Sequence, residues 1–454
     1  MRLTRRHFIQ SAAAGLAAAY FTSTRKLGAD KTFRPNILFI LTDDLGYGDL
    51  SGYGAQDMHT PNIDVLIENG MKFNNFYANC PVCSPTRAAL LTGRYPDLVG
   101  VPGVIRTYSS GNFGYLSPDA VLLPSMLKRA GYRTACIGKW HLGLESPNIP
   151  NDRGFDHFYG FLGDMMDDYY THLRHDKNYM RLNKDIIEPQ GHATDLFTQW
   201  AVEYLNNHQN PGQPFFLYLA YNAPHVPVQP PAEWVSKVRE REPEMDEQRA
   251  NLVALIEHMD DGIGKVIEAL KENGMSENTL IVFTSDNGGQ LKVGANNGDL
   301  RSGKQSMYEG GIKVPMCAVW PGHIKPGTTS NLVCMTMDWF PTLCDIAGIP
   351  VDHQIEGKSI LPALKGEEQE LNDRTIFWVR REGWFYGGRD YYAARYKNWK
   401  LVQETPFENY QLYDLSSDPL EQNPLTQDHE MYNKLKKELR AHIQQAGKVP
   451  WQKP

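Results

Sequence analysis

Two short acidic motifs carry the side chains of this 454-residue chain that are best suited to holding a metal ion. Asp43-Asp44 and Asp286-Asn287 each follow an apolar run, and together they offer three carboxylates and one amide oxygen. Oxygen-only ligand sets suit the hard cations calcium and magnesium better than zinc. A single such pair after a strand is more often a turn or a helix cap. Two pairs at equivalent strand ends predict one shared site of the calcium type.

A second group of reactive residues surrounds Cys83. The CPVC pattern at residues 80–83 is compatible with haem attachment, a zinc site or a redox pair. Haem attachment would need a histidine where Ser84 stands, zinc would need a second ligand pair, and a redox pair would suit a thioredoxin-sized chain. The next residues read SPTR, with Ser84 as a candidate cap, Pro85 at the first helical position and Arg87 one turn on. This pattern places Cys83 at a helix N-terminus beside an arginine, which is an anion site.

Lysine and histidine residues follow two further apolar runs. Lys139 and His141 come directly after residues 133–137, and His225 comes shortly after residues 215–220. In open α/β sheets, ligands bind beyond the carboxyl ends of the strands. If these runs are parallel strands, four strand ends deliver four oxygen ligands, one lysine and two histidines to one edge of the sheet.

The alternation of apolar runs and helical patterns predicts the elements that position these residues. Five runs, several of them apolar almost throughout, are typical of strands: residues 36–41, 72–77, 133–137, 215–220 and 279–284. Between them lie patterns typical of helices: residues 61–69, 124–130 and about 246–273. Because nearly continuous apolar strands are covered on both faces, we predict an α/β sandwich with a large mixed sheet between helices.

The pattern changes after about residue 374. Four short runs follow, at residues 375–379, 391–396, 399–403 and 411–414. After them comes an amphipathic helical pattern from about Met431 to Gln445. They predict a small C-terminal antiparallel sheet with one helix packed on it. The charged stretch 361–372 is the best candidate for a linker. We therefore divide the chain into an export signal at 1–29, a catalytic domain at 30–374 and a C-terminal subdomain at 375–454.

Composition excludes one class of partner. Apolar residues make up 41% and charged residues 22% of the chain, and the net charge is −7. These values are ordinary for a globular protein and give no electrostatic reason for binding nucleic acid, which we exclude. The six cysteines are too few and too scattered for a disulfide scaffold, although a Cys334–Cys344 pair stays open.

The N-terminus predicts export. Arg5 and Arg6 precede the apolar run 12–21, and Leu27-Gly28-Ala29 closes a pattern that has twin-arginine character. The apolar run is too short to span a bilayer, and no cysteine follows it that could take a lipid. We expect a periplasmic or secreted protein that begins near Asp30 and has no stable membrane anchor.

Residues 83–87, CSPTR, match the Cys-x-Pro-x-Arg signature of the type I sulfatases. Further motifs follow in the order of that family: DDLGYGD (43–49), GKWHLG (138–143), TSDNGG (284–289), LRSGKQSMYEGGIKVP (300–315) and LYDLSSDPLEQNPL (412–425). The chain therefore resembles the formylglycine-dependent sulfatases, including the arylsulfatases and N-acetylgalactosamine-6-sulfatase, over nearly its whole mature length. This resemblance implies an alkaline-phosphatase-like sandwich and the hydrolysis of sulfate esters.

The resemblance also implies roles for the matched residues. Cys83 becomes formylglycine through a formylglycine-generating enzyme, and the hydrated aldehyde attacks sulfur and later expels sulfate through its second hydroxyl. Calcium, held by the two acidic motifs, polarises a sulfate oxygen. Arg87 steadies the diol and the metal ligands. Lys139 and Lys304, the latter in a Gly-Lys setting that matches the family, bring positive charge to the sulfate oxygens.

Two histidines match the acid–base residues of the family. His225 matches the histidine that protonates the leaving alcohol, and His141 matches the one that removes a proton from the sulfated diol. The rival functions are a phosphodiester or phosphonate hydrolase of the same superfamily and a sulfoglycan-binding protein without catalysis. A two-metal phosphatase would need more ligands than the sequence offers, and the complete set of matched residues argues against a loss of activity.

The sequence says less about the substrate, for which we predict a sulfated carbohydrate or an aryl sulfate. Residues 154–172 resemble the variable pocket region of glycan sulfatases, and within them Asp168 and His172 are candidate sugar contacts. The run 378–392, rich in aromatic residues and arginine, either closes the pocket or packs between the domains.

Overall fold

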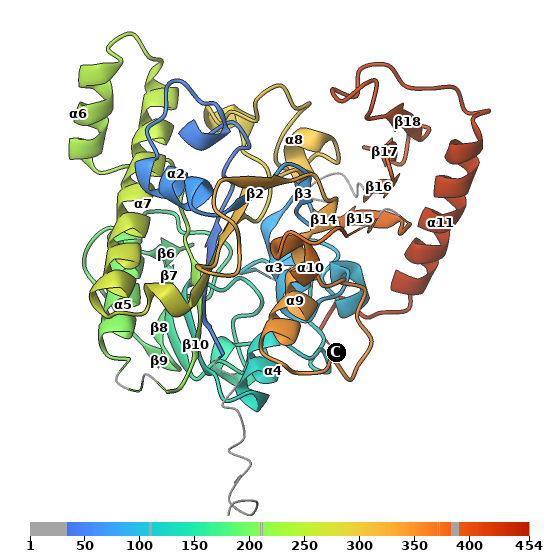
Figure 1. The fold of residues 1–454 in the computed structure, drawn as a ribbon. Coiled ribbons are helices and arrows are strands. Elements are labelled where there is room, and N and C mark those ends of the chain that lie inside the picture. Colours follow the sequence, from blue (N-terminus) through green and yellow to red (C-terminus); the bar gives the residue numbers. More distant parts are fainter. Residues whose placement is uncertain are drawn as a thin grey trace, which may run out of the picture. The chain divides into compact units, whose positions relative to one another are not determined.

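A large mixed sheet lies at the centre of the computed structural model (Figure 1), and it has ten strands. The structure describes residues 34–108, 111–208, 210, 212–369, 371, 373–382 and 390–453. The strands lie in this order: β13 (Thr328–Ser330), β2 (Met71–Phe73), β12 (Met316–Val319), β11 (Thr279–Ser285), β1 (Asn36–Thr42), β10 (Phe215–Ala220), β4 (Arg133–Lys139), β5 (His157–Phe161), β8 (Met180–Leu182) and β9 (Asp185–Ile186). The five strands from β11 to β5 are mutually parallel, and β12 and β8 flank them in antiparallel pairing. The predicted mixed sheet is confirmed. The export signal predicted at 1–29 lies outside the described residues.

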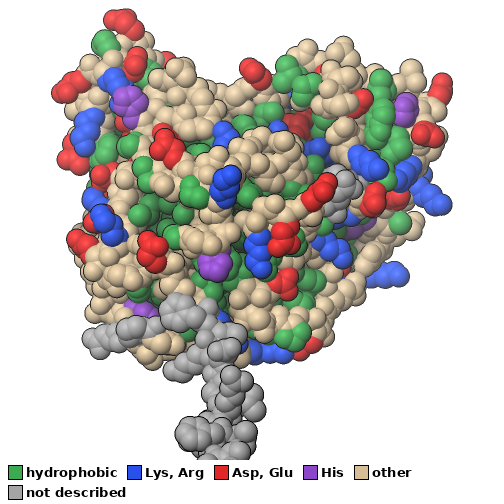
Figure 2. All heavy atoms as spheres, in the orientation of Figure 1, with side chains coloured by type: hydrophobic (Ala, Val, Ile, Leu, Met, Phe, Trp, Pro, Cys, Tyr) green, Lys and Arg blue, Asp and Glu red, His purple; other side chains and the backbone are tan. Residues whose placement is uncertain are grey.

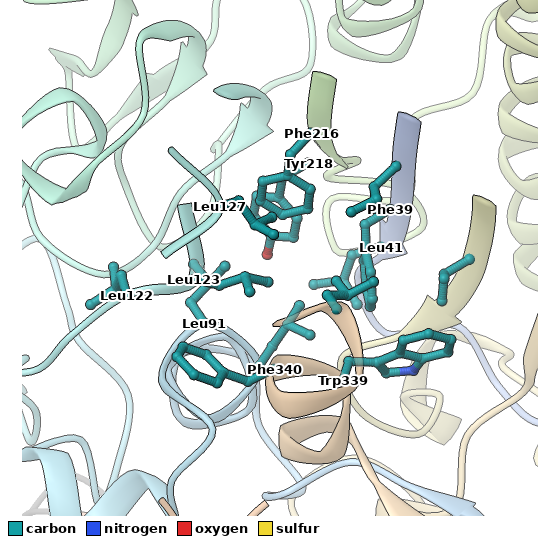
Figure 3. Packing of buried hydrophobic residues seen from close by; sticks show 14 of the residues in the cluster. Phe39, Leu41, Leu91, Leu122, Leu123, Leu127, Phe216, Tyr218, Trp339 and Phe340 are labelled. Carbon is teal, nitrogen blue, oxygen red and sulfur yellow. The ribbon is translucent and has the colours of Figure 1, made fainter. Parts of the chain in front are cut away.

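Helices cover both faces of this sheet, because its strands are apolar on both sides. Alternate residues of β1 belong to two separate cores, Phe39 and Leu41 to one and Leu38 and Ile40 to the other. The first core is closed by α3 (Cys83–Thr92), α4 (Leu123–Arg129) and α9 (Trp339–Ile346), as Figure 3 shows. The second is closed by α2 (Pro61–Glu68), α5 (Ala193–Asn206) and α7 (Glu247–Glu272). The predicted sandwich is therefore confirmed.

One predicted strand is wrong. The run 72–77 is split into β2, which belongs to the large sheet, and β3 (Phe76–Tyr77), which pairs with β14 (Cys334–Met335) in a separate two-stranded sheet. The chain leaves the large sheet at Asn74, whose backbone N–H donates to Ser330 O at 2.9 Å. The other α-helices and strands before the C-terminal part are β6 (Leu173–Arg174), β7 (Lys177–Asn178), α6 (Ala232–Arg241), α8 (Glu309–Ile312) and α10 (Leu361–Leu364).

The C-terminal part forms the predicted small sheet. Its four strands are β15 (Ile376–Arg381), β16 (Asp390–Tyr396), β17 (Trp399–Gln403) and β18 (Gln411–Asp414), and each pairs with the next in antiparallel orientation. The helix α11 (Glu430–Ala446) packs on them. The Trp378 indole donates to Ala78 O at 2.8 Å, and Lys400 lies buried between Glu309 at 2.8 Å and Glu421 at 2.7 Å. The sheet is thus fixed directly to the segment after β3 and to α8. The domain boundary near residue 374 stays a prediction.

The surface carries mixed charge. Lysine and arginine side chains are interspersed with aspartate and glutamate over the face shown in Figure 2. All six cysteines are buried free thiols, Cys334 and Cys344 included. Among the described residues, no helix combines the length and the apolar character that a membrane crossing requires.

Candidate active site

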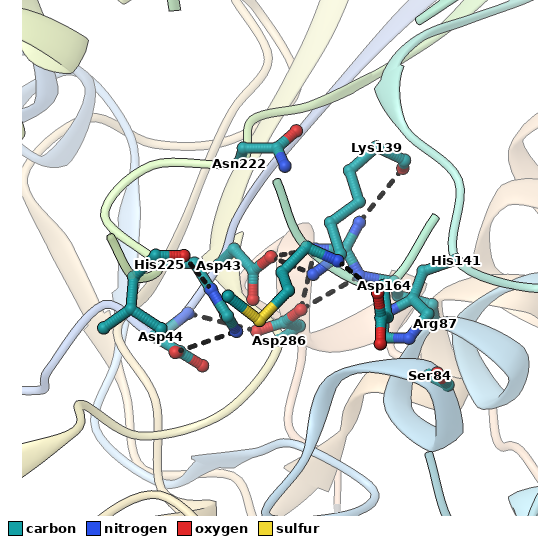
Figure 4. Close-up of polar contacts among 12 residues, drawn as sticks. Asp43, Asp44, Ser84, Arg87, Lys139, His141, Asp164, Asn222, His225 and Asp286 are labelled. Atoms are coloured by element: carbon teal, nitrogen blue, oxygen red, sulfur yellow. Dashed lines mark hydrogen bonds and ion pairs between the residues drawn. The ribbon is translucent and has the colours of Figure 1, made fainter. Parts of the chain in front are cut away.

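The carboxyl ends of β1 and β11 bring the two acidic motifs together (Figure 4). Thr42 and Ser285 end the two strands in register, so the residues that follow them are neighbours. Carboxylate oxygens of Asp43, Asp44 and Asp286 lie within 4.8 Å of one another, and all three residues are buried. The Asn287 amide donates to Asp44 Oδ1 at 2.8 Å. The structure therefore places the four predicted metal ligands in one cluster.

This cluster fits a hard cation. Asp43 Oδ1 and Asn287 Oδ1 are buried and have no hydrogen-bond partner among the described residues. Burial and the neighbouring Asp43 carboxylate raise the pKa of Asp286 to about 7, although Arg87 acts in the opposite direction. Buried carboxylates at this separation repel one another unless positive charge lies between them. Oxygen donors from three carboxylates and an amide match the ligand preference of calcium.

Cys83 stands at the N-terminus of α3, as predicted, but the start of the helix was predicted wrongly. The helix begins at Cys83 itself, with Val82 as the N-cap, so Ser84 is not the capping residue. The Ser84 hydroxyl instead accepts the N–H of Ile105 at 3.1 Å. Pro85 still lies in the first turn, where the absence of an N–H costs no helical hydrogen bond.

The environment of Cys83 keeps its side chain protonated. Burial raises the pKa of the thiol to about 11, and Asp43 adds to this while Lys139 opposes it. The thiolate is the reactive form of cysteine, so an unmodified Cys83 is a poor nucleophile near neutral pH. The same reasoning disfavours a redox role for the CPVC pattern.

Three cations neutralise the acidic cluster. The fully buried Arg87 donates from Nε and Nη2 to Asp286 Oδ2 at 2.9 and 2.7 Å, and from Nη1 to the carbonyl of Lys139 at 3.1 Å. Lys139 Nζ forms an ion pair with Asp43, and Lys304 Nζ lies 2.6 Å from Asp44 Oδ2. Each carboxylate of the cluster is thus paired with its own cation. Breaking such a buried pair strands a charge, which costs about 3–5 kcal/mol.

The two histidines present different nitrogens to this region. His225 Nδ1 lies 2.8 Å from the carbonyl of Val226 and must donate to it, so Nε2, 3.6 Å from Asp44 Oδ2, carries the lone pair of the neutral ring. His141 Nε2 donates to the carbonyl of Ile105 at 2.8 Å, and its Nδ1 is buried with no partner among the described residues. Burial lowers both pKa values, and the nearest lysine acts in the same direction in each case. Both rings are therefore neutral at pH 7 in the free protein.

A pocket of about 180 Å³ opens onto these residues. Four of the predicted residues line it: Cys83, His141, His225 and Lys304. Four further charged residues that the sequence did not single out as site residues also line it: Arg106, Asp164, Arg380 and Glu382. Arg380 and Glu382 belong to the run 378–392. Trp378, at the start of the same run, packs against the catalytic domain, where its indole donates to Ala78 O. Residues 383–389 of the run lie outside the described ranges. The two interpretations of that run thus hold for different residues.

The structure does not bring Asp168 and His172 to this pocket. Asp168 accepts the N–H groups of Tyr170 and Thr171 at 2.8 and 2.7 Å, and so closes a turn. His172 Nε2 hydrogen-bonds the carbonyl of Gly191 at 2.9 Å and lines a different pocket. Asp164 and Met165, a few residues before Asp168, are the residues of this segment that line the catalytic pocket. Sugar contacts by Asp168 and His172 stay a prediction.

Comparison with known proteins identifies the family. The family model described as Sulfatase matches residues 35–349, and the model described as N-sulphoglucosamine sulphohydrolase, C-terminal, matches residues 302–448. This chain belongs to the sulfatase family. It is a sulfuric ester hydrolase, as the motifs predicted.

Individual sulfatases resemble the chain over most of its length. N-acetylgalactosamine-6-sulfatase of Homo sapiens is 34% identical over 390 residues, which is 80% of this chain and 72% of that protein. Arylsulfatase A of Homo sapiens is 33% identical over 376 residues, 76% of this chain and 70% of that protein. The crystal structure of Ps i-CgsB in complex with k-i-k-neocarrahexaose has a TM-score of 0.84 at 33% identity, covering 91% of this chain and 93% of that one.

Proposed function

We propose that this sulfatase hydrolyses sulfate esters of glycans in the pocket at Cys83, with residue 83 as formylglycine and calcium held by the acidic cluster. The observation that carries this proposal is the closeness of Cys83, which lines the pocket, to the acidic cluster: ligand atoms of Cys83, Asp43 and His225 lie within 4.8 Å of one another. Within that cluster Asp43 Oδ1 and Asn287 Oδ1 are buried and have no hydrogen-bond partner among the described residues. The names of the relatives, which include an N-acetylgalactosamine-6-sulfatase and a protein whose crystal structure is a complex with k-i-k-neocarrahexaose, support a glycan substrate.

The two implied groups supply the chemistry that the unmodified chain lacks. A formylglycine hydrate supplies one hydroxyl for attack on sulfur and another for release of sulfate, and calcium supplies positive charge for the ester oxygens. Lys304, which lines the pocket, adds a second positive charge next to Asp44. Arg87 fixes the position of the Asp286 carboxylate. It also fixes the end of β4, because it donates to the carbonyl of Lys139. Charges held in place before the reaction stabilise the transition state without reorganisation.

The histidines handle protons at defined atoms. His225 Nε2 lies at the pocket, where Asp44 and an arriving sulfate anion both favour its protonation, so it holds a proton for the leaving alcohol. His141 Nδ1 is an unpartnered acceptor beside the same pocket, suited to taking a proton from a hydroxyl on residue 83.

Substrates with different leaving groups separate the two histidine roles. We expect His225→Ala to slow hydrolysis of a sugar sulfate by about 10²–10⁴-fold, because a sugar alkoxide needs a proton to leave. An activated phenol needs none, so 4-nitrophenyl sulfate turnover should fall much less. His141→Ala should slow both substrates alike, since its proton transfer does not involve the leaving group. The ratio of kcat/KM values for the two substrates is the measurement, and an equal loss on both in His225→Ala would contradict the donor role.

The reaction type is tested with matched esters. The enzyme, produced together with a formylglycine-generating enzyme, is assayed on an aryl sulfate, on the corresponding aryl phosphate, on N-acetylgalactosamine 6-sulfate and on sulfated carrageenan oligosaccharides. We expect release of sulfate from the aryl sulfate and from at least one glycan. Faster hydrolysis of the phosphate would favour the rival phosphohydrolase, and no hydrolysis by protein that carries the aldehyde would favour the non-catalytic rival.

We further propose export of the folded enzyme through a twin-arginine signal that includes Arg5 and Arg6. Oxidation of Cys83 has to precede the burial of α3, so maturation takes place in the cytosol before a route that carries folded proteins. Lysine at both positions should therefore retain active, aldehyde-bearing enzyme inside the cell. The measurement is sulfatase activity and the mass of the Cys83 peptide in cytosolic and exported fractions. Normal export of the double variant would count against this route. So would retained protein that keeps the Cys83 thiol while the exported protein carries the aldehyde.

A further inference from the structure

A second group of metal-ligating side chains lies between α5 and α7, which run side by side (Figure 1). His192 is the N-cap of α5, Asp195 lies in the first turn of that helix, and His258 belongs to α7. Each of the three offers a ligand atom, and these atoms lie within 4.8 Å of one another. Two imidazoles and one carboxylate are typical ligands of zinc, in contrast to the oxygen-only set of the acidic cluster.

Hydrogen bonds hold both imidazole rings in the form that a metal-bound histidine takes. His192 and His258 are only 2% and 4% exposed. His192 Nε2 lies 3.0 Å from the carbonyl oxygen of Gln229 and must donate to it, so its lone pair is on Nδ1. His258 Nε2 donates to Asp195 Oδ1 at 2.8 Å, and its Nδ1 is buried with no hydrogen-bond partner among the described residues. A histidine that ligates a metal usually donates its other N–H to a carbonyl or a carboxylate in this way.

The charges at this cluster suit a cation. Burial lowers the pKa of His192 to about 4, although its hydrogen bond to Gln229 opposes this, so the ring carries no second proton at pH 7. Burial would raise the pKa of Asp195, but the hydrogen bond from His258 holds it below its ordinary value. The ionised carboxylate offsets the positive end of the α5 dipole. Its side chain is 55% exposed, which gives an ion a path from solvent. The bond that a metal on His192 Nδ1 would displace is a long one, from the N–H of Thr194 at 3.2 Å.

Tyr169 connects this cluster to the loop that carries His225. The Tyr169 ring stacks on His192 with ring centroids 5.0 Å apart, and its hydroxyl donates to the carbonyl of His225 at 2.8 Å. The N–H of Tyr169 donates at 2.8 Å to the side chain of Gln229, the residue whose carbonyl fixes His192. An ion bound to His192 would therefore hold α5, α7 and this loop together.

We propose that His192, Asp195 and His258 form a second metal site, which takes a divalent transition metal such as zinc. Its role is to stabilise the fold, since none of its three ligands lines the catalytic pocket. The site differs from the acidic cluster in its ligand chemistry and in the helices that carry it. The inference goes beyond the proposed function and does not depend on it, because zinc binding is measured without substrate.

Zinc binding by calcium-saturated protein tests the site. Excess calcium occupies the acidic cluster, and uptake of Zn²⁺ by the whole chain is then followed by calorimetric titration and by metal content after dialysis. We expect one zinc ion per chain and an unfolding temperature that rises by a few degrees when zinc is added, because the ion binds only the folded state.

Variants of the ligands locate the bound ion. His258→Gln and Asp195→Asn should each weaken zinc binding by about 100-fold or more, since loss of an outer-shell partner alone costs about 10–100-fold. Asp195→Asn keeps an oxygen acceptor for His258 on an exposed side chain, so it tests the site even if His258→Gln disturbs the packing of α7. The unfolding temperature of each variant without zinc shows whether the fold is retained.

His208→Gln is the matched control. His208 is a half-buried histidine outside the cluster whose Nε2 likewise donates to a carbonyl, that of Gln213 at 2.9 Å. This variant should bind zinc as the parent does. No zinc uptake by the calcium-saturated parent overturns the proposal, and so does an equal zinc affinity in the parent and in folded His258→Gln or Asp195→Asn protein. Either result leaves the proposed sulfatase activity standing, because that activity depends on Cys83 and the acidic cluster.

Discussion

Replacing Cys83 by alanine is expected to lower the hydrolysis of every sulfate ester by about 10⁴-fold or more, with the fold retained. Among the described residues that line the pocket, Cys83 is the one that the sulfatase signature marks for conversion to a nucleophile, and an alanine there offers no oxygen for attack on sulfur. Its neighbours do not depend on it, because Arg87, Lys139 and the acidic cluster are held by their own ion pairs. The loss should therefore appear in kcat, while the unfolding temperature changes by only a few degrees.

Cys80→Ala is the matched control for this experiment. Cys80 is equally buried in the same CPVC pattern, but its thiol lies 3.5 Å from the carbonyl of Val379 and does not line the catalytic pocket. We expect that variant to keep most of its activity and to lose about 1 kcal/mol of stability, as small deletions in a core do. If both cysteines were needed equally, a redox pair would explain CPVC better than a single modified residue.

Removal of calcium is expected to lower activity by about 10²–10³-fold, in a way that added calcium reverses. The buried oxygens Asp43 Oδ1 and Asn287 Oδ1 then lose their partner, and sulfate loses a charge that draws it to the pocket. Calcium should restore activity better than zinc, because all four ligands are hard oxygens. The measurement is turnover after chelation and after return of each metal, with metal content determined in parallel. Full activity in protein shown to be free of metal would contradict this role.

The metal-free protein should also show a specific dependence of stability on pH. The pKa of Asp286 is raised to about 7 in the folded chain, above the value near 3.8 of an exposed aspartate. The folded state therefore binds this proton more tightly than the unfolded state, and stability is lost as pH rises from about 4 through 7. The unfolding temperature of chelated protein should fall over this range, and calcium should remove most of the difference. An unchanged unfolding temperature between pH 5 and 8 without metal would show that the carboxylates do not repel one another.

The large elements of the fold were predictable because their sequences are locally consistent. β10 has the predicted bounds, and β1, β4 and β11 extend only one or two residues beyond them. These strands are nearly continuous apolar or β-branched runs, for which burial and propensity favour the same structure. The prediction that their carboxyl ends share one edge is confirmed by the parallel pairing from β11 to β4, which brings Asp43, Lys139 and Asp286 together.

Other features depend on contacts that sequence patterns do not reveal. The break between β2 and β3 depends on two different pairing partners, β13 for β2 and β14 for β3, which are more than 250 residues away. The helix at Cys83 begins earlier than its capping pattern indicated, because the Ser84 hydroxyl bonds to Ile105 and not to the helix. Arg106 and Arg380 come from a loop and an edge of the small sheet, and only the packed structure shows that they line one pocket. This part of the pocket wall is therefore the part of the site least visible in the sequence.

The most direct test of the whole account is the mass of the peptide that contains Cys83, measured in enzyme whose sulfatase activity has been recorded in the same preparation. The account predicts that sulfur is lost at residue 83 and an aldehyde takes its place, in a fraction that tracks specific activity from one preparation to the next. Cys80, on the same tryptic peptide, serves as an internal reference and should keep its thiol. Fully active enzyme with an intact Cys83 thiol would contradict the account.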